Sequence, residues 1–304
     1  MLTIEKYGAI DIGSNAIRLL ISSIHEEEGQ TTRFKKTSLI RLPIRLGTDV
    51  FKTNRVSEEN ITRMIDTMQA YRLLMKTHKV VRYKACATSA MREAENGKEV
   101  VALIKEKTGI HINIIDGKDE AAIIAMTDLH ELINTDATYL YVDVGGGSTE
   151  FTLYHNGKTI TSKSFKLGTV RLLEGLVQES IWNDVERWIT QHTKNYTRVS
   201  LIGSGGNINN IFKNSGKSPG KPISFLYLSS YYKLLNSLTY EDRIWQLNLN
   251  QDRADVIVPA TRIYLSAMKW SKAKNIFVPK IGLSDGIIKS LYNSKLKEQN
   301  SRKT

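Results

Sequence analysis

The chain has 304 residues, of which 41% are hydrophobic and 24% charged, a composition that excludes a disordered tail and a membrane protein. At about 150 residues per domain, its length predicts two domains with separate hydrophobic cores. Lysine and arginine (43) exceed aspartate and glutamate (31), which gives a net charge of +12. A surplus of that size is as compatible with a polyanionic ligand as with an ordinary basic protein.

The sequence lacks the signals of several common site types. Cys86 is the single cysteine, so no internal disulfide forms, and the six histidines are scattered without metal-ligand spacing. The first apolar run is interrupted by Glu5, Asp11 and Arg18, and no run reaches the roughly 18 residues of a membrane helix. We therefore expect a cytoplasmic protein with no membrane partner and no specific nucleic-acid partner.

The first part of the chain predicts strands and helices in alternation. Residues 4–24 are typical of a strand, a turn and a second strand. A helix follows the good N-cap Ser57, because apolar residues recur at helical spacing from Ile61 to Leu74. The other elements predicted here are strands at 31–40, 80–87 and 111–115, a helix at 98–107 closed by Gly109, and a helix at 119–133.

The opening pattern then returns. A strand at 139–144 runs into DVGGGST, and the next strand turns back through Asn156-Gly157, a dipeptide typical of a type I′ hairpin. A helix at 182–192, a strand at 198–202, the turn GSGGN and a mostly helical segment to Asn293 follow, with a frayed tail from Ser294. This degenerate duplication predicts an α/β protein of two domains, 1–126 and 127–304, with a ligand cleft between them and a last helix able to pack back on the first domain.

Three glycine-rich turns follow apolar strands: DIGSN at 11–15, DVGGGST at 143–149 and GSGGN at 203–207. Without a Cβ, glycine allows consecutive backbone N–H groups to converge on an anion. Asp11 and Asp143, at the ends of the first two strands, can hold a hard cation that touches the phosphate. One such turn is more often an ordinary hairpin, but three together indicate a metal-bridged phosphate site.

Two other phosphate-binding motifs are excluded by the sequence. A dinucleotide fingerprint from Gly145 would need glycine at position 150, which is Glu150, and a helix where a strand is predicted. A P-loop ending at residues 216–218 would need glycine in place of Ile211 and would follow a helix rather than a strand.

Two acidic side chains are candidates for acid–base chemistry. Asp119, at a helix start, ordinarily serves as a capping and dipole residue. Glu120 precedes the apolar run AAIIAM, so its helix is largely buried and can hold a general base beside a phosphorus atom. By alternation, Glu150 faces either the same phosphate as Asp143 or solvent.

Two arginines and the cysteine have alternative readings. The planar fork of Arg92 suits phosphate, but a salt bridge to Glu93 or Glu95 is as compatible with the segment. Arg18 lies mid-strand among apolar residues and needs a partner if it points inward. Cys86, in a strand expected to be buried, is interpreted as a small hydrophobe rather than a nucleophile.

Five ordered segments, AIDIGSNAIRLLI, ATSAMREAENG, IIDGKDEA, VDVGGGSTE and IGSGGN, resemble the motifs of the exopolyphosphatase / guanosine pentaphosphate phosphohydrolase (Ppx/GppA) family. The resemblance runs from about Tyr7 to Gly286. It implies two ribonuclease H-like domains of the actin, sugar kinase and Hsp70 ATPase superfold, with Mg²⁺ as cofactor and a homodimer. Longer members carry a further C-terminal helical region of the HD type, so a minimal two-domain form is expected here.

The resemblance also implies roles for individual residues. Glu120 matches the general base, Asp143 and Glu150 match acids that bind metal and water, and Asp11 is a third expected metal ligand. Arg92 matches an arginine associated with phosphate. The implied phosphate-binding residues are Ser14, Asn15, Gly145, Gly146, Gly147, Ser148, Gly205 and Gly206.

The chain departs from the family pattern at three positions. Asp116 stands where the motif has serine, and Asp119 where glutamate is usual. In GLSDG, Ser284 replaces a basic residue, which weakens any contact with a polyanion there.

The expected activity is exopolyphosphatase, with guanosine pentaphosphate phosphohydrolase as the alternative. A non-catalytic polyphosphate or nucleotide sensor is a third reading, although a pure anion binder would avoid carboxylates at positions 120, 143 and 150. A sugar kinase or Hsp70-type ATPase would not account for ATSAMREAENG or DGKDEA.

Overall fold

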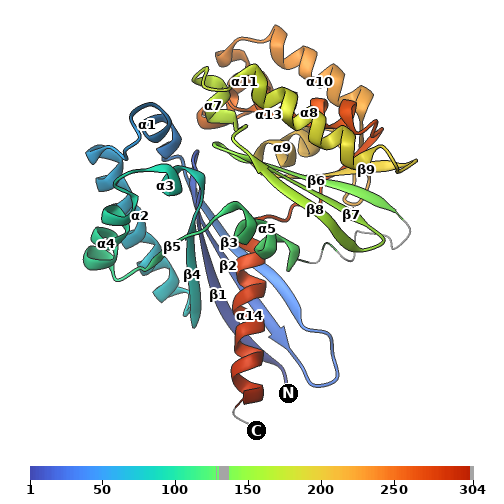
Figure 1. Ribbon diagram of the computed structural model, residues 1–304. Coiled ribbons are helices and arrows are strands. Elements are labelled where there is room, and N and C mark those ends of the chain that lie inside the picture. Colours follow the sequence, from blue (N-terminus) through green and yellow to red (C-terminus); the bar gives the residue numbers. More distant parts are fainter. Residues whose placement is uncertain (128, 130–136, 302–304) are drawn as a thin grey trace. The chain divides into compact units, whose positions relative to one another are not determined.

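The computed structural model describes residues 1–127, 129 and 137–301 (Figure 1). The chain divides into two compact units, each an α/β unit with one sheet and flanking helices. Unit 1 comprises Met1–Thr127 and Leu283–Thr304, and unit 2 comprises Asp128–Gly282. The C-terminal segment therefore groups with unit 1. The domain bounds expected from the sequence ran to residue 304 but allowed for a last helix that packs back on the first domain.

The sheet of unit 1 has the strand order β3-β2-β1-β4-β5, in which β1 is antiparallel to β2 and parallel to β4. Side chains alternate along β1, so Ile10 and Ile12 join the core beneath the helices while Ala9 and Asp11 lie on the opposite face. The strands are β1 (Thr3–Ile12), β2 (Ile17–Glu26), β3 (Arg33–Leu42), β4 (Arg82–Ala87) and β5 (Ile112–Ile114).

The helices of unit 1 begin and end largely where local signals predict. Ser57 caps α2 by accepting a hydrogen bond from the N–H of Asn60, and Gly109 ends α4 in the left-handed conformation. A short helix at Leu46–Thr53 was not predicted from the sequence. The helices are α1 (Leu46–Thr53), α2 (Glu58–Thr77), α3 (Ser89–Glu93), α4 (Gly97–Thr108), α5 (Gly117–Ala125) and α14 (Leu283–Ser301).

The prediction of a frayed tail from Ser294 was wrong, because α14 continues to Ser301. Figure 1 shows α14 alongside β1, and Lys295 forms ion pairs there with Glu5 at 2.8 Å and Glu26 at 2.6 Å. Burial opposes the positive charge of Lys295, but hydrogen bonds to the two carboxylates raise its pKa above the ordinary value. These long-range ion pairs hold the helix where its polar sequence suggested fraying.

The sheet of unit 2 has the strand order β10-β11-β9-β6-β7-β8. Asn156 and Gly157 both have positive φ in the β7–β8 turn, which confirms the predicted type I′ signal. The strands are β6 (Thr138–Val144), β7 (Thr149–His155), β8 (Lys158–Phe165), β9 (Val199–Ser204), β10 (Ile223–Ser224) and β11 (Asn275–Phe277).

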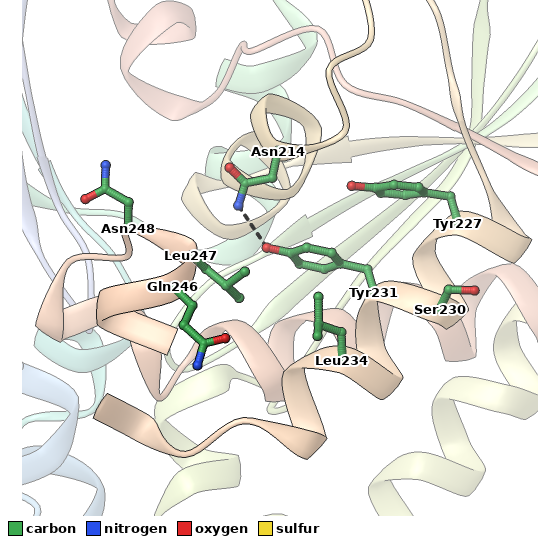
Figure 2. Close-up of a pocket in the computed structure, with 8 residues that line it drawn as sticks. All are labelled: Asn214, Tyr227, Ser230, Tyr231, Leu234, Gln246, Leu247 and Asn248. Atoms are coloured by element: carbon green, nitrogen blue, oxygen red, sulfur yellow. Dashed lines mark hydrogen bonds between the residues drawn. The ribbon is translucent and has the colours of Figure 1, made fainter. Parts of the chain in front are cut away.

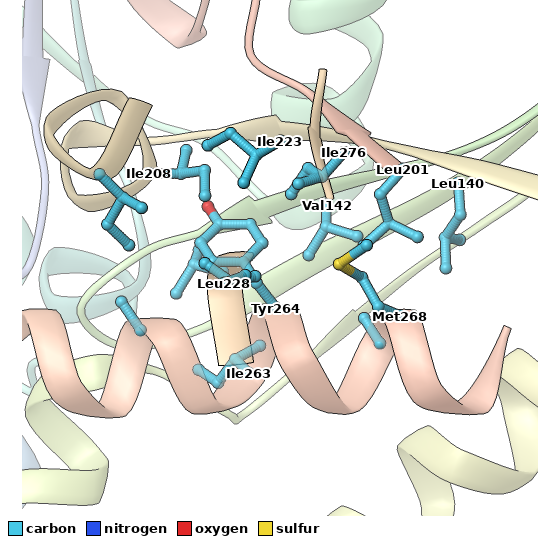
Figure 3. Close-up of a cluster of buried hydrophobic side chains, with 14 of the residues drawn as sticks. Leu140, Val142, Leu201, Ile208, Ile223, Leu228, Ile263, Tyr264, Met268 and Ile276 are labelled. Carbon is cyan, nitrogen blue, oxygen red and sulfur yellow. The ribbon is translucent and has the colours of Figure 1, made fainter. Parts of the chain in front are cut away.

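Helices cover one face of this sheet. Val142 and Leu201 pack with Tyr264 and Met268 of α13 in the main core of unit 2 (Figure 3). Because neighbours along a strand alternate, Asp143 lies on the face opposite Val142. The helices are α7 (Thr169–Leu173), α8 (Glu179–Thr193), α9 (Gly206–Asn214), α10 (Phe225–Ser237), α11 (Tyr240–Leu247), α12 (Gln251–Ala254) and α13 (Ile257–Trp270).

The helix predicted at 119–133 is shorter in the structure. It begins at Gly117 and ends at Ala125, with Met126 as its C-cap, and residues 128 and 130–133 of the prediction lie outside the described residues. Within the described part of the chain, no helix is both long and apolar enough to cross a membrane.

Candidate functional site

The first two glycine turns have the same local geometry, one in each unit. The N–H of Gly13 donates to the carbonyl of Ala16 at 3.1 Å, and that of Gly145 donates to the carbonyl of Ser148 at 2.9 Å. Each turn follows an aspartate at the same place in the preceding strand. The strand after the turn then places Arg18 opposite Asp11 in unit 1, and Glu150 opposite Asp143 in unit 2.

In unit 2, four polar residues stand in one row across the sheet. Asp143 of β6 is in register with Glu150 of β7 and with Ser204 of β9, and Glu150 is in register with Ser164 of β8. Glu150 is only 3% exposed, and its Oε1 accepts hydrogen bonds from the hydroxyls of Ser148 at 2.7 Å and Ser164 at 2.8 Å. Glu150 therefore lies buried on the same face as Asp143, not in solvent.

The donor chemistry of this row fits a hard divalent cation. Asp143 and Glu150 offer only oxygen, which Mg²⁺ prefers, and serine hydroxyls orient the Glu150 carboxylate. The described residues contain no group of three or more His, Cys, Asp or Glu side chains gathered to hold a metal. A magnesium ion here would keep several water ligands, as is usual for this ion.

The 145–148 loop is held from one side by the start of α7. Three hydrogen bonds fix its carbonyls: Thr169 N–H to Gly145 at 3.0 Å, Val170 N–H to Gly146 at 2.8 Å, and Arg171 Nε to Gly147 at 2.7 Å. The N–H groups of Gly146 and Gly147 donate to no group in the part of the chain that the structure describes. The loop thus presents two backbone donors, the chemistry of an anion site.

Close packing behind this loop requires glycine at position 168. A Cβ on Gly168 would lie 2.3 Å from the carbonyl oxygen of Gly146 and 2.5 Å from the carbonyl carbon of Gly147. Backbone atoms cannot yield as a flexible side chain can, so Gly168 fixes the position of the loop.

The third glycine turn lies beside Asp143. Gly205 has φ of +116°, which favours glycine, and a Cβ there would lie 3.6 Å from Oδ1 of Asp143. Arg253 of α12 donates from Nη1 to the carbonyl of Gly206 at 2.6 Å. The second and third turns and the acidic row are therefore brought together at one end of the unit 2 sheet.

In unit 1, Asp11 has a different environment from Asp143. It is 7% exposed, and Nη1 of Arg18 lies 3.3 Å from its Oδ2. Burial raises the pKa of Asp11, and the Arg18 guanidinium opposes that rise. Arg18 thus has the partner that an inward-facing arginine requires.

The side chains of the first turn are packed within unit 1. Ser14 is 2% exposed, and its hydroxyl shares a hydrogen bond with that of Ser89 at 2.9 Å. The carbonyl of Ser14 accepts from the N–H of Gly47 at 2.8 Å. The first turn is therefore filled by side chains, whereas the second turn has backbone alone at Gly146 and Gly147.

Glu120 is 8% exposed in the first turn of α5, whereas Asp119 is exposed. The helix is capped by Asp116, whose Oδ1 accepts from the N–H groups of Lys118 and Asp119, both at 2.8 Å. The hydrogen bonds from these N–H groups lower the pKa of Asp116. Aspartate therefore supplies the cap at the position where the family motif has serine.

The carboxylates of Asp11 and Glu120 both act on the Cys86 thiol. Burial raises the pKa of Cys86 to about 11, Lys84 opposes the rise, and the negative charges of Asp11 and Glu120 add to it. Cys86 is in register with Asp11 across the sheet, so both carboxylates lie near this face of unit 1. The thiol is protonated at neutral pH, which agrees with a packing role for Cys86.

The hydrogen bond of the Arg92 side chain is to a backbone carbonyl. Its Nη1 donates to the carbonyl of Ile115 at 2.8 Å, and Glu95 pairs with Arg55 across 3.8 Å. Ser284, which replaces the basic residue of the family motif, is buried, and the neighbouring Asp285 pairs with Lys36 at 2.8 Å.

Sequence reasoning missed three residues that support the unit 2 loops: Ser164, Arg171 and Arg253. Ser164 and Arg253 carry no local signal, because strand register and a helix distant in sequence bring them to the site. Arg171 does carry a local signal, since an arginine within the apolar segment TVRLL needs a partner if it is buried.

The chain matches the model of the Ppx/GppA phosphatase family over residues 24–295. Three curated relatives are each similar over part of their length. A bifunctional 3-dehydroquinate synthase/phosphatase of Fusobacterium nucleatum is 32% identical over 228 residues, which cover 67% of this chain and 34% of that protein. Exopolyphosphatase 2 of Mycobacterium tuberculosis is 31% identical, covering 57% of this chain and 55% of that protein. A guanosine-5′-triphosphate,3′-diphosphate pyrophosphatase of Photobacterium profundum is 30% identical, covering 55% and 33%.

The chain thus spans between about a third and about half of the length of these relatives. Two solved structures share its fold over almost the whole chain. An exopolyphosphatase of Cytophaga hutchinsonii has a TM-score of 0.81 at 23% identity, covering 95% of this chain and 98% of that one. A Ppx/GppA family member of Aquifex aeolicus has a TM-score of 0.75 at 24% identity, covering 96% and 99%. Because the family model matches most of its residues, the chain belongs to the Ppx/GppA phosphatase family.

Proposed function

We propose that this chain is an exopolyphosphatase, which releases phosphate by hydrolysing the terminal phosphoanhydride bond of inorganic polyphosphate. The observation that carries the proposal is the combination in unit 2 of two carboxylates in register, Asp143 and the buried Glu150, with a glycine loop whose carbonyls are fixed by the start of α7 and whose N–H groups point the other way. Carboxylates repel phosphate, so carboxylates and a phosphate-binding loop act together only where a cation lies between the carboxylates and the phosphate. The similarity to exopolyphosphatase 2 of M. tuberculosis supports the same substrate class.

In this proposal, the residues of unit 2 bind the terminal phosphoryl group. The N–H groups of Gly146 and Gly147 donate to its oxygens, with the turn at Gly205 and Gly206 as a further contact. Ser148, whose hydroxyl donates to Glu150, completes the loop and orients that carboxylate. Asp143 and Glu150 would hold Mg²⁺, which when bound neutralises the charge that develops on the phosphoryl oxygens. The Arg18 ion pair makes Asp11 a weaker candidate as a third ligand.

The proposed base is Glu120. A water oxygen forms a bond to the terminal phosphorus while the bridging P–O bond breaks, and the shortened polyphosphate leaves with that bond pair. Glu120 takes a proton from the attacking water, and Arg92 binds the phosphoryl group. Glu120 is buried in the first turn of α5, and this supports the role because a positioned carboxylate is what a general base requires.

Guanosine pentaphosphate is the alternative substrate, which the similarity to the P. profundum pyrophosphatase favours. It also ends in a phosphoanhydride, so the same residues would serve. A sensor with the fold and little turnover is the remaining reading.

The test is phosphate release by the purified protein from long-chain polyphosphate, short polyphosphate and guanosine pentaphosphate, each with Mg²⁺ and with EDTA. We expect metal-dependent release, fastest from polyphosphate. Faster release from guanosine pentaphosphate would mean that guanosine pentaphosphate is the substrate. Tight polyphosphate binding without phosphate release would mean that the protein is a sensor and not an enzyme. Light scattering of the same sample tests the homodimer expected from the family resemblance.

A further inference from the structure

Unit 2 contains a cavity away from the glycine turns. It has a volume of about 550 Å³ and is formed by the end of α9, by α10 and by the end of α11 (Figure 2). Asn214, the last residue of α9, contributes to it, whereas Gly205 and Gly206 are the N-cap and the first residue of that helix. At 1.5 Å per residue the two ends of α9 are roughly 12 Å apart, so this cavity is separate from the phosphate loops.

The walls of this cavity are aromatic and aliphatic. Tyr227 and Tyr231, one turn apart on α10, have nearly parallel rings whose centroids are 6.0 Å apart at an angle of 14°. Leu234 follows on the same side of the helix, as Figure 2 shows. A cavity of this size falls within the range of roughly 300–1,000 Å³ that is usual for small-molecule sites.

Its polar groups are side-chain amides and hydroxyls. Asn214 donates from Nδ2 to the hydroxyl of Tyr231 at 2.9 Å, which fixes the orientation of both groups. Gln246 and Asn248 contribute two further amides from the end of α11, and both are exposed at the mouth. Among the described residues, none that lines the cavity is charged. The ligand group that fits is therefore neutral, with donors and acceptors at its edge.

We propose that this cavity binds the base of a nucleoside or small nucleotide. A nucleobase is flat and uncharged and has adjacent donors and acceptors that pair with Asn and Gln amides. Its faces pack against tyrosine rings and leucine. The Gln246 amide donates to Asp242 at 3.0 Å, which holds it in place and leaves its oxygen to accept from a ligand, and a purely apolar ring, such as a phenylalanine side chain, would not use that acceptor. A bare phosphate would find no cation among the lining residues. The inference does not depend on the proposed hydrolase activity.

Calorimetric titration of the whole chain with adenosine, guanosine, cytidine and uridine tests the proposal. Nucleosides carry no phosphate, so they do not compete for the glycine loops. We expect saturable binding of at least one nucleoside, unchanged by saturating pyrophosphate. Tyr227→Ala and Gln246→Ala should each weaken it about tenfold, because each removes one wall or one amide. Tyr232→Ala, on the same helix but outside the lining, is the matched control and should bind as the parent chain does.

Three outcomes would overturn the proposal. These are no saturable binding at millimolar nucleoside, displacement of the nucleoside by pyrophosphate, and equal affinity of the Tyr227→Ala and Tyr232→Ala variants. Gln246 is exposed, so its substitution leaves the fold intact and keeps the test valid even if Tyr227→Ala is unstable. Thermal unfolding of each variant checks this.

Discussion

The two units repeat one strand–turn–strand motif but differ at the residue opposite the aspartate. In unit 1 the partner of Asp11 is Arg18, 3.3 Å away, and in unit 2 the partner of Asp143 is Glu150. Replacing arginine by glutamate at this position changes the local charge from +1 to −1. The first pair is an ion pair, whereas the second pair is two carboxylates, whose oxygens are the ligand type that a hard cation prefers. One duplicated motif thus contains an internal ion pair in one copy and the proposed metal ligands in the other.

The turns themselves differ in the same direction. Ser14 of unit 1 is buried and bonded to Ser89, whereas Gly146 and Gly147 occupy the corresponding turn of unit 2 and present bare backbone. Side chains fill the first turn, whereas the second has none at these two positions, which suits the proposed phosphate contact. This comparison is the reason that the proposal assigns metal and phosphate to residues of unit 2.

The largest expected effect is on turnover when Glu120, the proposed base, is replaced. Glu120→Gln keeps the shape of the side chain and removes its ability to take a proton, so kcat should fall by about 10²–10⁴-fold. The matched control is Asp119→Asn, the exposed neighbour on the same helix, which should retain activity within a few-fold. Steady-state phosphate release at saturating polyphosphate measures both. Wild-type turnover by Glu120→Gln would remove unit 1 as the source of the base.

The next effect tests the metal assignment in unit 2. Glu150→Gln should raise the Mg²⁺ concentration for half-maximal activity by about 10–100-fold, because a ligand charge is lost. Arg18→Gln, at the equivalent position of unit 1, should leave that concentration unchanged. A Mg²⁺ titration of phosphate release distinguishes the two. An equal shift in both variants would contradict the proposal that Glu150, and not the equivalent position of unit 1, binds the metal.

A smaller effect concerns the glycines that pack against the two turns. Gly168→Ala places a Cβ against the backbone of Gly146 and should cost about 1–3 kcal/mol of unfolding free energy. Gly47→Ala in unit 1 meets the ring of Phe51, with the Cβ 2.7 Å from Cε2, and this ring can move aside. Urea unfolding should show the greater loss for Gly168→Ala, and the opposite order would contradict the rigidity of the unit 2 loop.

The smallest effect concerns the ion pairs that Lys295 of α14 forms within unit 1. Lys295→Met should cost about 1–2 kcal/mol at pH 7, since Glu5 and Glu26 lose their shared cation. Burial opposes ionisation of Glu5, but hydrogen bonds from Lys295 and Tyr7 lower its pKa.

The pH dependence of this cost follows from that shift. A lowered carboxylate pKa gives stability that is present above the unfolded value near 4.3 and is lost as the pH falls through the folded value. The difference between parent and Lys295→Met should therefore shrink below about pH 4. The raised pKa of Lys295 keeps the contribution intact through neutral pH. Thermal unfolding from pH 3 to pH 8 measures it, and a difference that grows on acidification would contradict the ion pairs.

Much of the fold was predictable because its signals are local. The cap at Ser57, the C′ glycine at Gly109 and the hairpin at Asn156-Gly157 act over a few residues, and each occurs where the sequence predicts it. The failures have a common cause. The helix at Leu46–Thr53 is too short for a periodic signal, and the last turns of α14 depend on ion pairs with strands almost 300 residues earlier in the chain.

The sequence by itself determined the family and the loop residues of the candidate site, since five ordered motifs carry both. It left the direction of Glu150 open, because alternation allows either face until the register with Asp143 is known. Tertiary structure alone decided that register, the supporting positions of Arg171 and Arg253, and the membership of α14 in unit 1. Each of these depends on contacts between segments distant in sequence, and such contacts leave no periodic or compositional trace in the segments that make them.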